Sequence, residues 1–487
     1  MVSRAWLFGL VLGVPLVGFG VSEAIQAHLN SELRTVLRKE FPSVGEGQLA
    51  SITVDRLCQE PIPELRELCF TQGNLTLMSR GALGAGGVGL TLLLLIRLGG
   101  RLARGNRNLL LILFKPGLYF TLICLVGLIA VHAAIAMAAI YYGESAITDR
   151  VHVGLIFAIG LGAVAGILAM TRSAFALVKR AETVVVGRAL RRDQAPRLWE
   201  LVDHTASRLG SLRPEHVVVG LDPNFFVTEA DVVCLEGRLK GRTLYCSLPL
   251  CRILSTRELE AVIGHELGHF KGKDTEFSKH FYPIYRGTTS AISSLQATGG
   301  EGSRAVALLP AIAILSYFLE CFSIAESRLS RERELAADGA AASVTSRAII
   351  AAALVKIHAF AGVWETIQNA ATVALREGKL LINASRLFAE MVAQRAALSA
   401  LSGMEDTQLT HPTDSHPPLT VRLRSLKTSV DDVNEAALDV SPADAAISLI
   451  SEAEEVEEEI SEAYQLLLAR HLAIELDRTA GVEMETA

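Results

Sequence analysis

Four apolar stretches in the first third of the chain have the composition of membrane-spanning helices, which need about 20 apolar residues. Half of the residues are hydrophobic, only 20% are charged, and the mean hydropathy is positive, which is unusual for a soluble chain of 487 residues. We therefore expect a multi-pass membrane protein. The stretches cover about Ala5–Val21, Leu83–Ile96, Leu118–Tyr142 and Val153–Thr171. The second of them is short but can be extended into its Gly-rich start.

The first stretch has two interpretations. It lies behind Arg4 and is either a cleaved signal peptide or an uncleaved membrane anchor. We favour the anchor, because the apolar region is long and Gly18–Ser22 makes a poor small-residue cleavage site.

Basic residues predict the orientation of the chain in the membrane. They gather in the loop after the second stretch and in the segment after the fourth, whereas the loop near Glu144 and Arg150 has no such excess. The positive-inside rule then places the N-terminus, the Arg-rich loop and the catalytic domain in the cytoplasm, in a protein of a bacterial-type inner membrane. The basic residues are Arg97, Arg101, Arg104, Arg107 and Lys115 in the loop, and Arg172, Lys179, Arg180, Arg188, Arg191 and Arg192 after the fourth stretch.

Two cysteines fall in the segment 23–80, which this orientation places outside the cytoplasm. We expect Cys58 and Cys69 to form a disulfide there, because such a compartment favours disulfides. The alternative is a pair of buried thiols. The other five cysteines lack the C-x-x-C spacing of metal ligands.

The segment His265-Glu266-Leu267-Gly268-His269 has the H-E-x-x-H pattern of a metal-binding helix. Histidines at positions i and i+4 lie on one helical face, as two ligands of a single Zn²⁺ require. The glutamate is then placed to accept a proton from water at the metal. Ser255 and Glu258 are spaced as a capping box, which favours a helix here. The alternative is a solvated helix that carries two histidines by chance.

Catalytic zinc has three protein ligands, so a third is needed. The charged start of an Ala-rich helix, Ser330–Asp338, provides Glu334 and Asp338 on one face. Its small alanines would let it approach the histidine helix closely.

These motifs together resemble those of the HtpX-like membrane metallopeptidases, relatives of the type I CAAX prenyl proteases. In that family H-E-x-x-H is followed by S-R-x-x-E-x-x-A-D and then by S/T-H-P-P-L-x-x-R. The last two blocks are found here at Ser330–Asp338 and Ser415–Arg422, in the family's order. The resemblance covers about residues 190–426.

The resemblance implies a role for each matching residue. Glu334 would be the third ligand of one Zn²⁺ per chain, and Asp338 would support the ligands. His416 would lie near the substrate carbonyl, as a catalytic residue beside Glu266, and Arg422 would help hold the site.

The expected fold is mainly α, of the α+β class, with N-terminal transmembrane helices and a zincin-type catalytic domain that has a small β-sheet before the H-E-x-x-H helix. A strand at about Leu244–Leu248 is expected to pair with the substrate backbone. The domains would be a membrane anchor (1–22), an extracytoplasmic segment (23–80), three transmembrane helices (81–175), a zinc metallopeptidase domain (176–430) and an acidic helical tail (431–487).

A further long apolar run, Ala305–Ala325, lies between the histidine helix and Glu334. One full crossing of the membrane would separate Glu334 from the histidines, and the preceding segment is too polar for a return span. We therefore expect a helix buried against the peptidase domain, or one that dips into the cytoplasmic leaflet and returns.

The predicted function is that of a membrane-bound zinc endopeptidase that hydrolyses unfolded or membrane proteins in protein quality control. One alternative is a site-specific protease that processes a precursor or a prenylated protein. The other is a non-catalytic zinc-binding membrane scaffold, against which Glu266 argues, since a structural site needs no general base. The expected partners are a protein or peptide substrate and the lipid bilayer. A homo-oligomer is compatible with the sequence. The sequence has no basic patch with interleaved aromatic residues, which argues against binding of nucleic acid.

Overall fold

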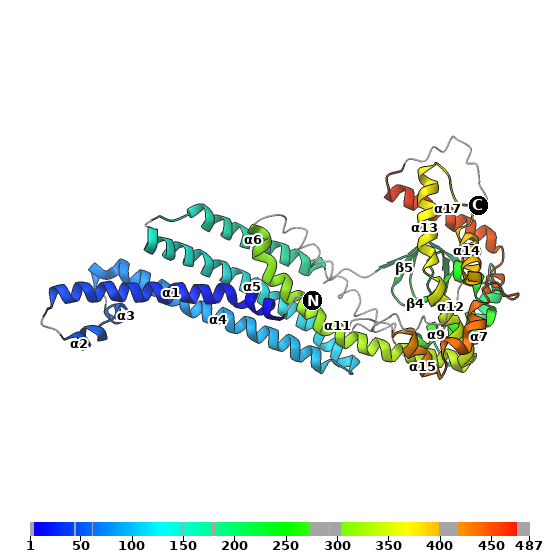
Figure 1. Ribbon diagram of the computed structural model, residues 1–487, viewed down its shortest axis with the longest axis horizontal. Coiled ribbons are helices and arrows are strands. Elements are labelled where there is room, and N and C mark those ends of the chain that lie inside the picture. Colours follow the sequence, from blue (N-terminus) through cyan, green and yellow to red (C-terminus); the bar gives the residue numbers. More distant parts are fainter. Residues whose placement is uncertain are drawn as a thin grey trace. The chain divides into compact units, whose positions relative to one another are not determined.

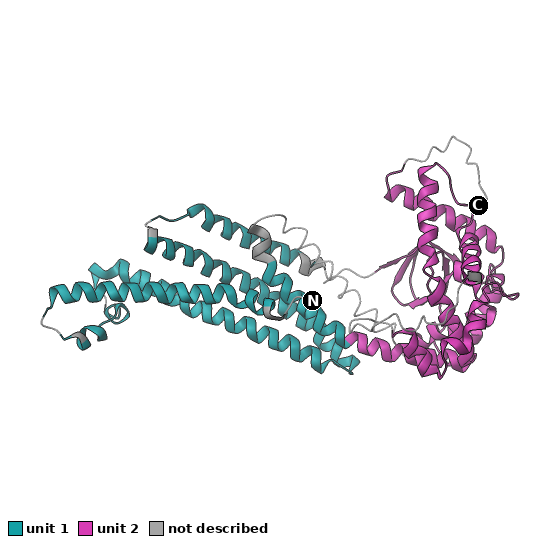
Figure 2. Ribbon diagram, viewed as in Figure 1, with its two compact units in different colours: residues 1–179, 283–325 teal, residues 180–282, 326–487 magenta. Residues whose placement is uncertain are grey.

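A computed structural model describes residues 4–42, 45–60, 62–148, 150–176, 182–271, 292, 303–398 and 417–474. It divides into two compact units, shown in different colours in Figure 2: unit 1 comprises residues 1–179 and 283–325, and unit 2 comprises residues 180–282 and 326–487. Apolar helices precede a region with small sheets, which confirms the predicted fold class.

Unit 1 is built from long helices that lie side by side (Figure 1). Among the described residues, six helical segments are long and apolar enough to cross a membrane: α1, α4, α5 and α6 of this unit, Leu309–Val344 and Arg347–Arg376. The elements of this part are α1 (Arg4–Glu40), α2 (Glu46–Ser51), α3 (Val54–Leu57), η1 (Pro63–Leu65), α4 (Arg66–Leu102), α5 (Arg107–Thr148) and α6 (Val153–Ala176).

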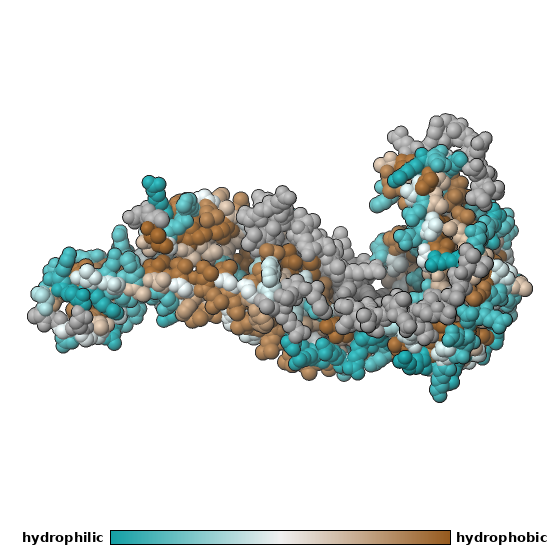
Figure 3. Space-filling model, in the orientation of Figure 1, coloured by the Kyte–Doolittle hydropathy of each residue, from teal (hydrophilic) through white to brown (hydrophobic). Residues whose placement is uncertain are grey.

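Helices α1 and α4 continue beyond their apolar parts into a polar hairpin. Figure 3 shows hydrophilic residues at the end of unit 1 that carries α2 and α3, and hydrophobic residues along the helices. Polar side chains join the two helices: Gln72 donates to Gln26 over 2.8 Å, and Ser22 donates to the carbonyl of Leu75 over 2.6 Å. A disulfide joins Cys58, which follows α3, to Cys69 in α4. The predicted outside segment is thus an extension of two membrane helices, cross-linked near its tip.

The apolar run Ala305–Ala325 lies in α11 (Ser303–Val344), and its placement corrects the sequence-based prediction. This half of α11 belongs to unit 1, where Phe318 and Phe322 each place their rings 5.5 Å from that of Phe114 in α5. A Cβ on Gly100 of α4 would lie 2.8 Å from the carbonyl oxygen of Cys321. The run therefore packs on α4 and α5 within unit 1, which corrects the expectation of a helix buried against the peptidase domain.

Unit 2 contains the sequence motifs. Its strands are β1 (Glu182–Val184), β2 (Gly187–Leu190), β3 (His216–Gly220), β4 (Phe226–Thr228), β5 (Asp231–Cys234), β6 (Gly237–Leu239) and β7 (Thr243–Ser247). Its helices are α7 (Pro196–Leu209), α8 (Leu248–Ile253), α9 (Thr256–Lys271), the second half of α11, α12 (Arg347–Phe360), α13 (Val363–Arg376), α14 (Ala384–Leu398), α15 (Leu419–Leu426), α16 (Val430–Leu438), η3 (Ala446–Leu449) and α17 (Ala453–His471).

The main sheet has the strand order β2-β3-β7-β4, and a second sheet has the order β1-β5-β6. Strand β7 is fully buried and paired on both sides, parallel to β3 and antiparallel to β4. The expectation that Leu244–Leu248 pairs with substrate is therefore wrong, because β7 has no free edge and Leu248 already starts α8. The edge strand on this side is β4, which packs near α9.

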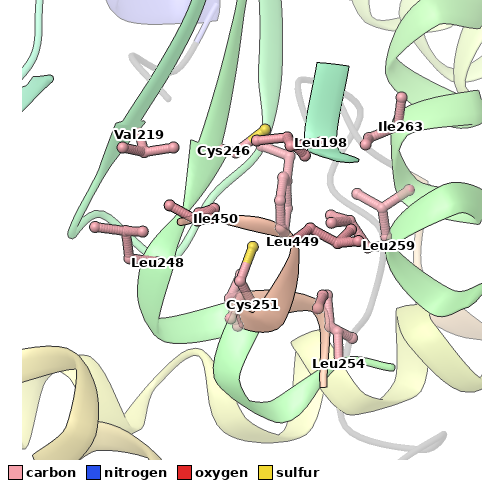
Figure 4. Close-up of a cluster of buried hydrophobic side chains, with 14 of the residues drawn as sticks. Leu198, Val219, Cys246, Leu248, Cys251, Leu254, Leu259, Ile263, Leu449 and Ile450 are labelled. Atoms are coloured by element: carbon pink, nitrogen blue, oxygen red, sulfur yellow. The ribbon is translucent and has the colours of Figure 1, made fainter. Parts of the chain in front are cut away.

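A continuous hydrophobic core joins the sheet to α9. Figure 4 shows Leu259 and Ile263 of α9 gathered with Val219 and Cys246 of the sheet and with Leu449 of η3. All of these side chains are at most 5% exposed. Because the apolar face of α9 is fixed in this way, its opposite face is held in a defined position.

The start of α9 is also held by polar contacts. The backbone N–H of Ser255 donates to Glu258 over 2.8 Å, and that of Glu258 donates to the Ser255 hydroxyl over 3.2 Å, so the predicted capping box is formed. Lys356 of α12 is only 1% exposed and donates to Glu258 over 2.8 Å and to the carbonyls of Ile253 and Asp439 over 3.2 and 2.6 Å.

The acidic helix α17 is anchored to unit 2 rather than solvated all round. Glu457 is fully buried and accepts two hydrogen bonds from Arg252, and Asn383 donates to it over 2.8 Å. Ile460 of α17 is also fully buried, whereas Leu467 of the same helix is 47% exposed.

We expect Lys356→Met to destabilise unit 2, because it leaves the Glu258 carboxylate buried without its cation. Breaking such a pair costs about 3–5 kcal/mol, which corresponds to a fall of about 10 °C in the melting temperature. Calorimetry of the detergent-solubilised protein would measure it. Lys240→Met, at an exposed position, is the matched control and should change stability by less than about 0.5 kcal/mol. Equal melting temperatures for the two variants would contradict the role assigned to Lys356.

Candidate metal centre and active site

Helix α9 places both histidines and Glu266 next to α11. His265 and Glu266 are buried, at 7% and 9% exposure, and His269 is half-buried. The rings of His265 and His269 have centroids 5.0 Å apart, with their planes nearly perpendicular. The spacing of four residues thus brings the two imidazoles to one face, as the sequence predicted.

Glycines on α9 allow the backbone of α11 to come close. A Cβ on Gly268 would lie 3.2 Å from the Cβ of Ala340 and 3.3 Å from the Cα of Ala337. A Cβ on Gly264 would lie 3.3 Å from the Cα of Ala341. Two successive turns of α9 thus each present a glycine to the alanines of α11. This agrees with the expectation that these alanines permit close approach of the two helices.

This close approach brings Glu334 to the histidines. Its two carboxylate oxygens lie 3.6 Å from Nε2 of His265 and 3.6 Å from Nε2 of His269. One ligand atom from each of the three residues lies within 4.8 Å of the others. Ligands about 2 Å from a tetrahedral metal ion lie about 3.3 Å apart, so the three side chains fit a single ion with little adjustment.

Asp338 contacts His265 at the ring nitrogen opposite the one that faces Glu334, and Arg422 holds Asp338. Asp338 is fully buried, and its Oδ1 lies 3.0 Å from Nδ1 of His265, which leaves Nε2 for a metal. Arg422, at the start of α15, donates to Oδ2 and Oδ1 of Asp338 over 2.9 and 2.6 Å. This two-point contact fixes the carboxylate that in turn orients the imidazole.

The electrostatics of the site favour a cation. Burial lowers the pKa of His265, but hydrogen bonds to Asp338 and Glu334 outweigh burial and raise it to about 9. Burial acts to raise the pKa of Asp338, yet the contacts with Arg422 and His265 hold it below its usual value. Burial raises the pKa of Glu266, although both histidines oppose this. Positive charge is therefore stabilised at the imidazole of His265, while Glu266 is a stronger base than an exposed glutamate.

Most of the site residues predicted from the sequence meet here: His265, Glu266, His269, Glu334, Asp338 and Arg422. His416 lies outside the described residues. The sequence analysis missed Gly264 and Gly268, although their spacing of four residues is a signal for close helix packing.

The comparisons with known proteins agree with this geometry. Residues 195–430 match peptidase family M48. A protease HtpX homolog of Archaeoglobus fulgidus is 30% identical over 240 residues, which cover 48% of this chain and 67% of the relative. The chain belongs to peptidase family M48. Other HtpX homologs, from Pyrobaculum calidifontis and Methanocaldococcus jannaschii, are 31% and 29% identical over 47% and 42% of this chain and 67% and 76% of their own lengths.

Membership of family M48 confirms the predicted HtpX-like resemblance and the assignment as a metallopeptidase. Its substrates are proteins, and its apolar helices make it a multi-pass membrane protein in a lipid environment. The family match begins at Ala195 and so includes strands β3 to β7, the metal centre and Arg422, but not β1 and β2.

We expect Gly268→Val to weaken metal binding in this M48 peptidase. Added bulk between packed helices costs about 1–3 kcal/mol, and the cost falls on the metal-bound state, in which α9 and α11 must be close together. Metal affinity should drop about tenfold, as measured by competition with a chelating dye. Gly339→Ala is the matched control: a Cβ there meets nothing within 4 Å, so affinity should not change. Unchanged affinity in Gly268→Val would show that the helix spacing does not matter.

Proposed function

We propose that this protein is a zinc-dependent endopeptidase that hydrolyses unfolded or membrane proteins. The observation that carries the proposal is the convergence of His265, His269 and Glu334, with Glu266 buried beside them. Two imidazole nitrogens and one carboxylate oxygen form a donor set typical of catalytic zinc. When bound, one Zn²⁺ per chain would polarise the scissile carbonyl and lower the pKa of water.

Glu266 is the proposed general base. It accepts a proton from the attacking water and then donates that proton to the leaving amine, so that no net charge builds up on the enzyme. Burial raises the pKa of Glu266, which makes its carboxylate a better proton acceptor than that of an exposed glutamate. The roles of Asp338 and Arg422 are positional: they hold His265 in the orientation that directs Nε2 toward the metal.

His416 is proposed to donate a hydrogen bond to the oxygen of the tetrahedral intermediate. The family block Ser415–Arg422 supports this role. Arg422, six residues after His416, contacts both Asp338 and Glu334, so the end of this block lies at the metal centre. One such donor contributes about 3–4 kcal/mol to the stabilisation of a transition state.

The proposed substrate is an extended segment of an unfolded protein. Strand β4 is an edge of the main sheet and packs near α9, so it offers unpaired backbone groups close to the metal centre. An extended peptide can pair with such an edge through main-chain hydrogen bonds, which depend little on sequence. This low selectivity suits the turnover of damaged or misassembled membrane proteins.

We further propose that unit 2 is cytoplasmic. The Arg-rich connection between α4 and α5 supports this orientation by the positive-inside rule. The disulfide between Cys58 and Cys69 also supports it, because disulfides persist in oxidising compartments. The hairpin formed by α1 and α4 would then project outside the cytoplasm.

Glu266→Gln should abolish hydrolysis while it preserves metal binding, since an amide has the shape of the carboxylate but cannot accept the proton. Loss of a general base lowers the rate by about 10²–10⁴-fold. Casein cleavage and metal content, measured on the same preparations, test this. His269→Ala should lose metal as well as activity. Near-normal cleavage by a metal-replete Glu266→Gln variant would refute the mechanism.

Labelling of introduced cysteines with a membrane-impermeant maleimide tests the orientation. In intact cells we expect Lys39→Cys, in the exposed hairpin, to react. Asn108→Cys, at the exposed start of α5, should react only after the membrane is opened. The reverse pattern would show that unit 2 faces the other side.

For His416→Ala we expect a fall in kcat of about 10²–10³-fold with little change in metal content or melting temperature. His416→Gln keeps a hydrogen-bond donor and should recover part of the rate. His411→Ala is the control, because that histidine lacks the rest of the block. Unchanged kcat, or loss of folding in both His416 variants, would indicate a packing role instead.

A further inference from the structure

A group of basic residues gathers where α4 ends and α5 begins, and the peptidase mechanism makes no use of it. Arg101, Arg104 and Lys115 are exposed, and Arg97 and Arg107 are half-buried. Between Glu67 and Glu144 the sequence contains no Asp or Glu, so neither α4 nor α5 supplies a nearby carboxylate. We call these five residues the basic cluster.

The basic cluster borders an apolar surface. Leu98, Leu102 and Ile112 are 48%, 55% and 63% exposed, and they lie among the basic residues on the same two helices. In a bilayer these side chains contact acyl chains, while the guanidinium and ammonium groups extend to the level of the headgroups. A ligand that complements both features has an apolar tail and an anionic head.

The α4 side of the basic cluster faces α11. Gly100 lets the α11 backbone at Cys321 approach α4, and Arg97 and Arg104 lie three residues before and four residues after Gly100 in the chain. Glu320 precedes Cys321 in α11, so it supplies a carboxylate on the helix that packs against this end of α4. Its charge opposes the binding of an anion there.

We propose that the basic cluster binds the headgroups of anionic phospholipids, so that the protein selects these lipids from a mixed bilayer. The occupant is a bilayer lipid and not a soluble anion, because the charges adjoin exposed leucine and isoleucine side chains that acyl chains cover in a bilayer. This selection differs from the positive-inside rule, which concerns how the chain inserts and not which lipids surround it. It rests on the membrane helices alone and does not depend on the proposed peptidase mechanism.

The test uses the full-length protein in vesicles with spin-labelled phosphatidylglycerol or spin-labelled phosphatidylcholine, and compares their association by electron spin resonance. We expect the wild type to prefer phosphatidylglycerol at low salt, with a preference that weakens as sodium chloride is added. Inorganic phosphate at equal ionic strength should weaken it no more than chloride does. A larger effect of phosphate would mean that the basic cluster is a site for soluble anions, and would overturn the proposal.

Three sets of variants test whether the preference for phosphatidylglycerol depends on the basic cluster. The triple variant Arg97→Gln/Arg101→Gln/Arg104→Gln should lose most of the preference for phosphatidylglycerol. Each charge removed should lower the relative association of the two lipids by at most about fivefold. The same three positions changed to Lys should keep the preference, which shows that charge and not packing is responsible. Glu320→Gln should strengthen it, and this variant removes no charge that orients the chain.

A control, Arg34→Gln/Lys39→Gln/Arg56→Gln, neutralises basic residues of the α1–α4 hairpin and should leave the preference unchanged. Equal association of the two lipids with the wild type, or an unchanged preference in both the triple Gln variant and Glu320→Gln, would overturn the proposal.

Discussion

The close contact between α9 and α11 is the constraint on which the metal centre depends. Gly264 and Gly268 face Ala337, Ala340 and Ala341, and this absence of bulk lets Glu334 reach two histidines on another helix. The cost of burying Glu334, Asp338 and Arg422 is offset because each of the three has a charged or imidazole partner. Glu334 lies between the histidines, and Asp338 lies between His265 and Arg422. The packing of two helices thus determines both the ligand geometry and the electrostatics.

The rest of unit 2 keeps α9 in its position. The hydrophobic face of α9 is fixed to the sheet through Leu259 and Ile263, and its first turn is fixed by Glu258 and Lys356. Helix α15 adds Arg422 to the metal centre from a third element. An imidazole that must meet an ion to within a few tenths of an ångström needs this kind of support, because a site on loose elements loses its geometry.

Local chemistry explains what the sequence could predict. H-E-x-x-H identifies two ligands and a base because helical periodicity alone places them, and Ser255 and Glu258 predict a helix start because the capping box is local. Glu334, Asp338 and Arg422 came from family resemblance, since no local rule connects residues that lie so far apart in the chain. Long-range packing was not predictable. The pairing of β4 with β7 and the contact of Phe318 and Phe322 with Phe114 depend on which elements become neighbours, and the buried partner of Lys356 lies 98 residues away.

X-ray absorption spectroscopy at the zinc edge is the most direct test of the central claim, that α9 and α11 together form one metal site. For the purified protein reconstituted with one equivalent of zinc, we predict scattering from two imidazoles and one carboxylate, with nitrogen and oxygen neighbours at about 2.0–2.1 Å. In Glu334→Ala the two imidazoles should remain at reduced metal occupancy. A spectrum with a single imidazole, or with sulfur neighbours at about 2.3 Å, would contradict the account.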